Sequence, residues 1–194
     1  SFAMALCGTA SADAVFNRIA SFPVNTNLPA DADQASPTSA EIVTATQDGM
    51  TLIYSDSPGK SVGFVDIADP KNPKAAGMVR LEGEPTSVAV AGQKVLIALN
   101  TSKSKVDPSG VLLTMVVAGK AIAKSCDLGG QPDSVAISPD GSIAAVAIEN
   151  ERDEELNDGE IPQLPAGFVA IFKLKDGAAD CDSRIMVDVK GLAA

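Results

Sequence analysis

Histidine and tryptophan are both absent from this chain of 194 residues, and tyrosine occurs once. Without histidine, these residues supply no Ser-His-Asp triad, no imidazole general base and none of the usual histidine-containing zinc sites. With one tyrosine and no tryptophan, the chain is also poorly supplied with the aromatic side chains on which bases or sugars stack. Many common enzyme and binding sites are therefore excluded from these residues.

Positive charge is scarce as well. Lys and Arg total 15 against 25 Asp and Glu, which gives a formal net charge of −10 and a pI near 4.4. Nucleic-acid binders need clustered basic side chains, so we expect no nucleic-acid partner, and a cation is the more natural one. No apolar run approaches the roughly 20 residues that a membrane-spanning helix needs, so we expect no transmembrane segment.

What the chain does contain is many short runs of Val, Ile and Ala, broken by 16 glycines and 12 prolines. β-Branched side chains favour strands, whereas glycine and proline mark tight turns. The hydrophobic fraction of 45% and the charged fraction of 21% are ordinary for a folded domain. These features predict an all-β fold.

The first twelve residues are small and apolar and end in Ala10-Ser11-Ala12. This pattern is typical of the apolar region and cleavage site of a secretory signal peptide. We therefore interpret residues 1–12 as a residual signal peptide cleaved after Ala12, and we expect an exported protein, periplasmic or extracellular. The alternative is a first strand or helix of the domain. Residues 13–39 are expected to hold a strand over 14–24 and then a polar linker.

A short motif recurs at nearly constant distance along the rest of the chain. Pro37-Thr38-Ser39, Pro85-Thr86-Ser87 and Pro132-Asp133-Ser134 lie 48 and 47 residues apart, and each leads into two short apolar strands around a glycine turn. A period of about 40 to 50 residues is typical of β-propeller blades. The alternative, a set of sandwich hairpins, rarely repeats a motif so regularly. We predict a β-propeller fragment of about three four-stranded blades, which span residues 40–83, 84–130 and 131–191.

Each predicted blade holds four strands, which are as follows. The first blade has 42–45, 50–55, 61–66 and 74–81; the second has 87–90, 94–99, 110–117 and 121–127; the third has 134–138, 142–148, 167–174 and 183–189. Because a meander reverses at every turn, alternate connections should emerge on one rim of the propeller. The connections expected on that rim are 55–60, 81–85, 100–109, 128–133 and 149–166.

The densest charge lies between Glu149 and Glu160, where seven carboxylates accompany one arginine and give a net charge of −6. Closely spaced oxygen ligands suit a hard cation, so we predict a Ca²⁺ site. Its candidate ligands are Glu149, Glu151, Asp153, Glu155, Asn157 and Asp158. The spacing is not that of an EF-hand, because Leu164 stands where a bidentate Glu would close the loop. The alternatives are a solvated charged loop and a charge network with Lys103 and Lys105 of the neighbouring rim connection.

Two cysteines are placed where neighbouring blades meet. Cys126 ends the predicted outer strand of the second blade, and Cys181 precedes that of the third. An exported protein permits disulfides, so we predict that these two cysteines form one. The alternative is a pair of free thiols.

Nucleotide-binding and serine-hydrolase motifs are not matched. The run Ser55 to Ser61, SDSPGKS, lacks the first glycine of a phosphate loop and the helix that such a loop opens, so it predicts a hairpin turn. A G-x-S-x-G nucleophile elbow does not occur.

Three stretches carry a resemblance to a known family: LIYSDSPGKSVGFVDIADPKNPKAAG, then GEPTSVAV, then GGQPDSVAISPDGSIAAVAIENERDEELNDGEIPQLPAGFVAIF. Together they resemble the amino-terminal propeller region of bacterial exported proteins with esterase-like activity of phytase. They are also similar to the related propellers of the choice-of-anchor and alkaline-phosphatase-like groups. The resemblance covers about residues 40 to 194 and implies a propeller, export and a chain that continues further, so that the fragment is incomplete at its C-terminus. No catalytic motif of that family can be matched to residues here.

Three functions remain open at this point. The first is an exported binding propeller whose acidic rim takes a divalent cation or a partner. The second, implied by the resemblance, is a metal-dependent phosphoesterase or esterase that binds a small anionic substrate through its cation. The third is adhesion to a protein or cell-surface partner, because fold alone does not fix function.

Overall fold

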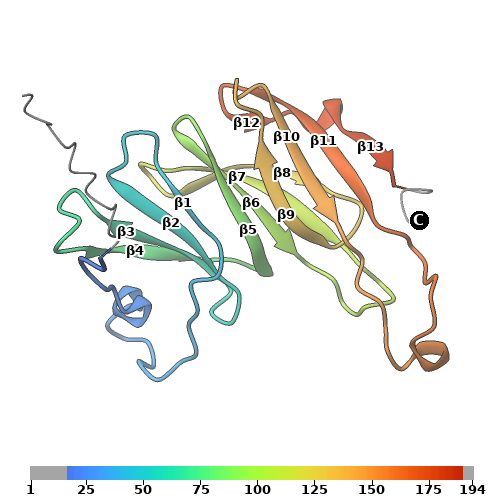
Figure 1. Ribbon diagram of the computed structural model, residues 1–194, viewed down its shortest axis with the longest axis horizontal. Coiled ribbons are helices and arrows are strands. Elements are labelled where there is room, and N and C mark those ends of the chain that lie inside the picture. Colours follow the sequence, from blue (N-terminus) through green and yellow to red (C-terminus); the bar gives the residue numbers. More distant parts are fainter. Residues whose placement is uncertain (1–16, 190–194) are drawn as a thin grey trace, which may run out of the picture.

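The computed structural model describes residues 17–189, which form three antiparallel sheets arranged side by side (Figure 1). The predicted signal peptide, residues 1–12, lies outside the described residues. In each sheet the strands pair in chain order as a meander, and neighbouring sheets pack face to face. The predicted all-β fold, a partial propeller of three blades, is confirmed.

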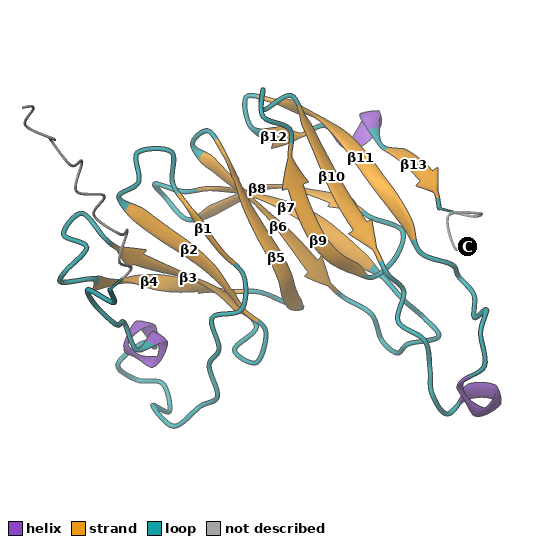
Figure 2. Ribbon diagram, in the orientation of Figure 1, coloured by secondary structure: helices purple, strands orange, loops and turns teal. Residues whose placement is uncertain are grey.

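The strands of the blades are shown in Figure 2. The first blade holds β1 (Val43–Ala45), β2 (Thr51–Asp56), β3 (Ser61–Asp66) and β4 (Lys74–Arg80). The second holds β5 (Glu84–Ala91), β6 (Lys94–Asn100), β7 (Gly110–Val116) and β8 (Ala121–Asp127). The third holds β9 (Pro132–Ile137), β10 (Ile143–Ile148), β11 (Phe168–Lys175), β12 (Ala178–Ala179) and β13 (Ile185–Asp188). Every strand predicted from residue 42 onward overlaps an observed one, and the ends differ by a few residues at most.

The first strands of neighbouring blades lie in contact, as the inner strands of a propeller do. β5 contacts both β1 and β9. The backbone N–H of Val135 in β9 donates a hydrogen bond to Ser87 Oγ in β5, at 3.2 Å. Both residues are buried, so this bond joins the two inner strands away from solvent.

Strand β6 shows how one sheet serves two interfaces. Successive side chains of a strand point to opposite faces. Val95, Ile97 and Leu99 therefore pack on the first blade, in a cluster with β2 and β3. Leu96 and Ala98 pack on the third blade, in a cluster with β10 and β11. A strand that is buried on both faces reads as a continuous apolar run, and the sequence VLIAL is such a run.

The strand predicted over residues 14–24 is wrong in its described part. Residues 17–23 have no regular secondary structure, and Val24–Asn27 forms a short 3-10 helix, η1. Asn27 explains why, because its buried amide donates to Tyr54 Oη and to the carbonyl of Phe64, each at 2.9 Å, and accepts from the N–H of Gly77 at 3.0 Å. The segment is thus held against the first blade by one side chain and not by a strand ladder.

The fourth strand of the third blade is interrupted. β12 and β13 both pair with β11, and the 3-10 helix η3 (Cys181–Ser183) lies between them. The Asp180 side chain accepts a hydrogen bond from the N–H of Asp182 and so caps this short turn. The interruption carries Cys181 out of the strand and into η3, which contacts β8 of the second blade.

Candidate functional site

A long connection between β10 and β11, residues 149–166, is the most prominent feature of one rim of the molecule. We call it the rim loop. In Figures 1 and 2 it extends below the sheets and carries the short 3-10 helix η2 (Leu156–Gly159) near its tip. The β2–β3 turn and the β6–β7 connection lie on the same lower side in Figure 1, as the meander argument predicts.

The base of the rim loop is fixed by one asparagine. Asn150 Oδ1 accepts a hydrogen bond from the N–H of Gln131, at 2.8 Å, and Asn150 Nδ2 donates to the carbonyl of Ala166, at 3.1 Å. Asn150 has a φ of 50°, in the left-handed region that asparagine tolerates better than most residues. One side chain therefore joins both ends of the loop to the start of β9.

The interior of the loop is fixed by a glutamine. Gln163 Oε1 accepts from the N–H of Asp153 at 2.7 Å, while Gln163 Nε2 donates to the carbonyls of Asp153 at 2.8 Å and Leu156 at 3.3 Å. Arg152 Nη1 adds a bond to the carbonyl of Gly159, at 3.0 Å. The loop is therefore an ordered structure with its own internal contacts.

Two of the loop's seven carboxylates lie near a cation. Lys105 Nζ is 3.8 Å from Glu151 Oε2, and the Arg152 guanidinium is 3.6 Å from Glu154 Oε1. Of the predicted lysine network, Lys105 reaches the loop, whereas Lys103 lies 3.9 Å from Asp107 in its own connection. The charge of the loop is only partly balanced by these contacts.

The six predicted calcium ligands are spread along the loop. Asp153 Oδ1 accepts from the N–H of Glu155 at 3.0 Å, and Asn157 and Asp158 adopt left-handed backbone conformations within η2. Within residues 17–189, no group of three or more Cys, Asp and Glu side chains is arranged to hold a metal ion. The calcium site stays a prediction.

The base of the loop brings Glu149 under the influence of two other carboxylates. Partial burial raises the pKa of Glu149 above its ordinary value, and the charges of Asp133 and Glu151 raise it further. Gln131 Nε2 lies 3.5 Å from Glu149 Oε1 and is the nearest donor to that group. One of the two carboxylates that act on Glu149 is therefore Asp133, which belongs to β9 and was not among the predicted ligands.

Exposed apolar side chains in the rim loop were missed by the sequence analysis. Ile161 is 75% exposed, Leu164 is 80% exposed and Leu156 is 42% exposed. The signal was present in the run IPQLP, in which two large aliphatic residues each precede a proline within a polar loop. The loop thus presents both acidic and apolar groups to its surroundings.

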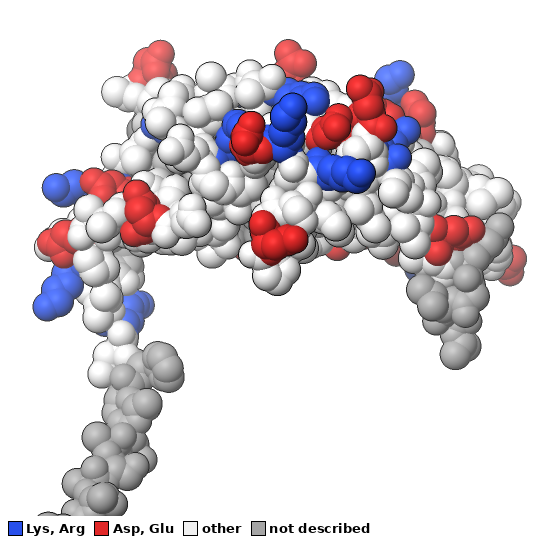
Figure 3. Space-filling model, turned by 90° about the horizontal axis from the view of Figure 1, so that it is seen from above, with Lys and Arg blue, Asp and Glu red and all other residues white. Residues whose placement is uncertain are grey.

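The face opposite the rim loop has a different character. Figure 3 views the molecule from that side and shows it as an arc on which basic and acidic side chains lie interspersed. Mixed charge of this kind gives no large single-sign field. We therefore place the candidate site on the rim loop.

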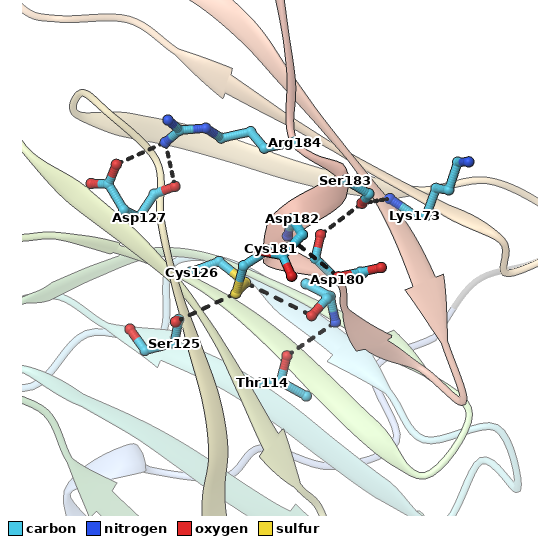
Figure 4. Close-up of a disulfide and its surroundings, with 11 residues drawn as sticks. Thr114, Ser125, Cys126, Asp127, Lys173, Asp180, Cys181, Asp182, Ser183 and Arg184 are labelled. Atoms are coloured by element: carbon cyan, nitrogen blue, oxygen red, sulfur yellow. Dashed lines mark hydrogen bonds and ion pairs between the residues drawn. A yellow bond between two sulfur atoms is a disulfide. The ribbon is translucent and has the colours of Figure 1, made fainter.

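Cys126 of β8 and Cys181 of η3 form a disulfide, with a Cα–Cα distance of 5.1 Å (Figure 4). The bond joins the second blade to the third, as predicted. Beside it, Arg184 Nη1 donates to both the carbonyl and Oδ2 of Asp127, each at 2.7 Å. The outer strands of these two blades are thus joined by a covalent bond and an adjacent ion pair.

Comparisons with known proteins agree with this architecture. The chain resembles hydrazine synthase of Kuenenia stuttgartiensis with 25% identity and a TM-score of 0.50, over 69% of this chain and 32% of that chain. It resembles in fold a functionally unknown protein from Desulfotomaculum acetoxidans DSM 771, with 11% identity and a TM-score of 0.50, over 80% of this chain and 41% of that one. The chain thus spans less than half the length of either structure. None of the curated proteins matches it.

Two further observations concern location and family. No helix within residues 17–189 has the length and apolar character needed to cross a bilayer. Residues 41–190, which include all three blades, match the model of the choice-of-anchor I domain family. The chain therefore belongs to the choice-of-anchor I domain family, and this membership indicates an exported or cell-surface module rich in β-structure.

Proposed function

We propose that this exported propeller module binds a partner protein through its rim loop. The observation that carries the proposal is the combination, in one hydrogen-bonded loop, of exposed aliphatic side chains and unbalanced negative charge. Propeller rims can vary while the blades beneath them stay fixed, which suits them to recognition.

The apolar groups supply the affinity. Burying one Leu or Ile side chain contributes about 1.5–3 kcal/mol. Ile161 and Leu164 are both largely exposed, so most of this stabilisation is still available to a partner. The hydrogen bonds of Gln163 hold the loop in place, so that less conformational entropy is lost on binding.

The acidic groups supply the specificity. Glu155, Asp158 and Glu160 have no cationic side chain within 4 Å among residues 17–189. Such carboxylates attract a basic surface, and complementary charge raises association rates and disfavours acidic partners. The partner that fits is a protein surface with an apolar depression bordered by Lys and Arg.

A displayed-peptide selection tests this proposal. Peptides would be selected on the native chain and counter-selected on the Ile161→Ser/Leu164→Ser variant. We expect clones rich in aliphatic and basic residues that lose binding to this variant and keep it with Val106→Ser, which removes an exposed aliphatic residue from the neighbouring connection. Clones that bind both variants equally, or that are acidic, would contradict the proposal.

Calcium is the second candidate occupant of the loop. Burial is the main cause of the raised pKa of Glu149, but the charges of Asp133 and Glu151 also raise it, and carboxylates that repel one another are stabilised by a cation between them. Binding to the folded state alone should stabilise it by about 2.7 kcal/mol at a hundredfold excess over Kd. Asp153→Asn/Glu155→Gln should abolish that gain. No change in Tm with millimolar Ca²⁺ and no heat of binding would leave the protein partner as the sole candidate.

Hydrolysis of phosphate esters, which the phytase-like resemblance implies, stays a prediction without an assigned residue.

A further inference from the structure

A second concave site lies on the first blade and has the opposite charge. It is a pocket of about 360 Å³ between the segment that precedes β1 and the adjoining ends of β3 and β4. In Figure 1 this segment runs from η1 to β1 past the β2–β3 turn. The lining residues are Leu28, Ser36, Pro37, Pro58, Gly59, Lys60, Met78, Arg80 and Leu81. A volume of this size is within the range of small-molecule sites.

The charged lining residues are both basic. Lys60 and Arg80 line the pocket, and no acidic residue within 17–189 does so. No carboxylate oxygen of the described part of the chain lies within 4 Å of the cationic nitrogens of either side chain. In a chain with a net charge of −10, two cations that face one pocket without an acidic partner are unusual. They provide the donors that an oxyanion requires.

The walls of the pocket are held together by one buried carboxylate. Asp56, which is 2% exposed, accepts from the N–H of Gly59 in the β2–β3 turn and from the N–H of Ser39 before β1, each at 3.0 Å. Gly59 is required here, because a Cβ at this position would lie 2.6 Å from Asp56 Oδ2. The N–H of Leu81 donates to the carbonyl of Lys60 at 2.8 Å and fixes the third wall.

The incoming segment is also fixed at its other end. Asn27, immediately before Leu28, makes the three buried hydrogen bonds described above. Gln34 Nε2 donates to the carbonyls of Pro29 and Ala32 and so braces the middle of the segment. The pocket is therefore formed before any ligand arrives.

We infer that this pocket binds a small organic anion, whose oxyanion group lies between Lys60 and Arg80 and whose short aliphatic body contacts Leu28, Met78 and Leu81. The planar guanidinium suits two oxygens of a carboxylate or phosphate, and the ammonium adds a compact second charge. The prolines and aliphatic side chains exclude a strongly hydrated body. This site belongs to the first blade and the rim loop to the third, so either assignment stands or falls without the other.

Calorimetry at low ionic strength tests the inference with three probes of similar body: hexanoate, hexyl phosphate and hexanol. We expect one or both anions to bind and hexanol not to bind. The anion that binds identifies the oxyanion as carboxylate or phosphate. Lys60→Gln and Arg80→Gln should each weaken binding about tenfold or more, as expected for the loss of a charge-assisted hydrogen bond. Lys74→Gln removes the same charge from β4 outside the pocket and should have no such effect.

A measurement on the native chain complements the variants. The bound anion should protect Lys60, but not Lys74, from acetylation, as read by peptide mass spectrometry. The inference would be overturned if neither anion bound or if hexanol bound equally well. It would also be overturned if the Lys60→Gln/Arg80→Gln variant kept its affinity, or if Lys60 were acetylated equally with and without the anion.

Discussion

Removal of the disulfide between the second and third blades tests the propeller packing most directly. The perturbation is Cys126→Ala/Cys181→Ala, in which both sulfurs are lost together and no new thiol remains at the site. The sequence separation of the two cysteines is 55 residues. A cross-link across a loop of that length limits the unfolded chain far more than a local one does.

The magnitude follows from the loop length. The chain-entropy relation gives about 4 kcal/mol for a closed loop of this size at 25 °C. Measured values usually fall below this figure, so we expect the free energy of unfolding to decrease by about 2–4 kcal/mol. The adjacent Arg184–Asp127 pair, which is partly exposed, contributes no more than about 1 kcal/mol and does not replace the bond.

Urea denaturation monitored by circular dichroism measures this change. The slope of the unfolding free energy against urea should rise as well, because an unfolded chain without the cross-link exposes more surface. Ser125→Ala is the control, since Ser125 is an exposed neighbour of Cys126 in β8 and its replacement leaves the disulfide in place. A decrease below about 1 kcal/mol with an unchanged slope would refute the argument that the bond constrains the unfolded chain.

Three other substitutions test packing, electrostatics and loop order. Gly63→Ala should lower the free energy of unfolding by about 1–3 kcal/mol, because the new Cβ would overlap the Tyr54 ring. The control is Gly119→Ala, where a Cβ meets open space, and equal Tm values for the two variants would contradict the prediction. Glu149→Gln should stabilise the fold by up to about 0.5 kcal/mol at neutral pH, because the raised pKa means that deprotonation costs stability. That gain should vanish below the ordinary pKa of 4.5, and a gain that grows on acidification in a pH series of urea titrations would contradict it. Gln163→Ala should speed hydrogen exchange across 150–166, since one side chain makes three of the loop's bonds, and unchanged exchange would speak against that role.

The strands were predictable because their signals are local. Alternation of apolar residues and turn glycines located β2, β3, β6 and β10 to within a residue or two at each end. The early start of β5 was not predictable, because Glu84 and Pro85 pair with β6 across an irregularity in register. The absence of a strand over 17–23 likewise depends on the distant contacts of Asn27, which no local pattern reveals.

The candidate sites were predictable in part. Charge density located the rim loop, and the constant blade spacing placed the two cysteines at one interface. The exposed aliphatic residues of the run IPQLP were missed, although their position before prolines in a polar loop was a local signal. The basic pocket was missed because Lys60 and Arg80 are brought together only by the pairing of β3 with β4 and by the segment that covers their ends.

The rim loop shows where reasoning from net charge alone fails. Six net negative charges within twelve residues suggest a loop that a cation must compact. The described loop is held by neutral amides, because the side chains of Asn150 and Gln163 bond to its backbone and join its two halves. Most of its carboxylates are exposed, where water screens their repulsion. Order and charge therefore have separate causes in this loop, and the charge is available to the partner that we propose.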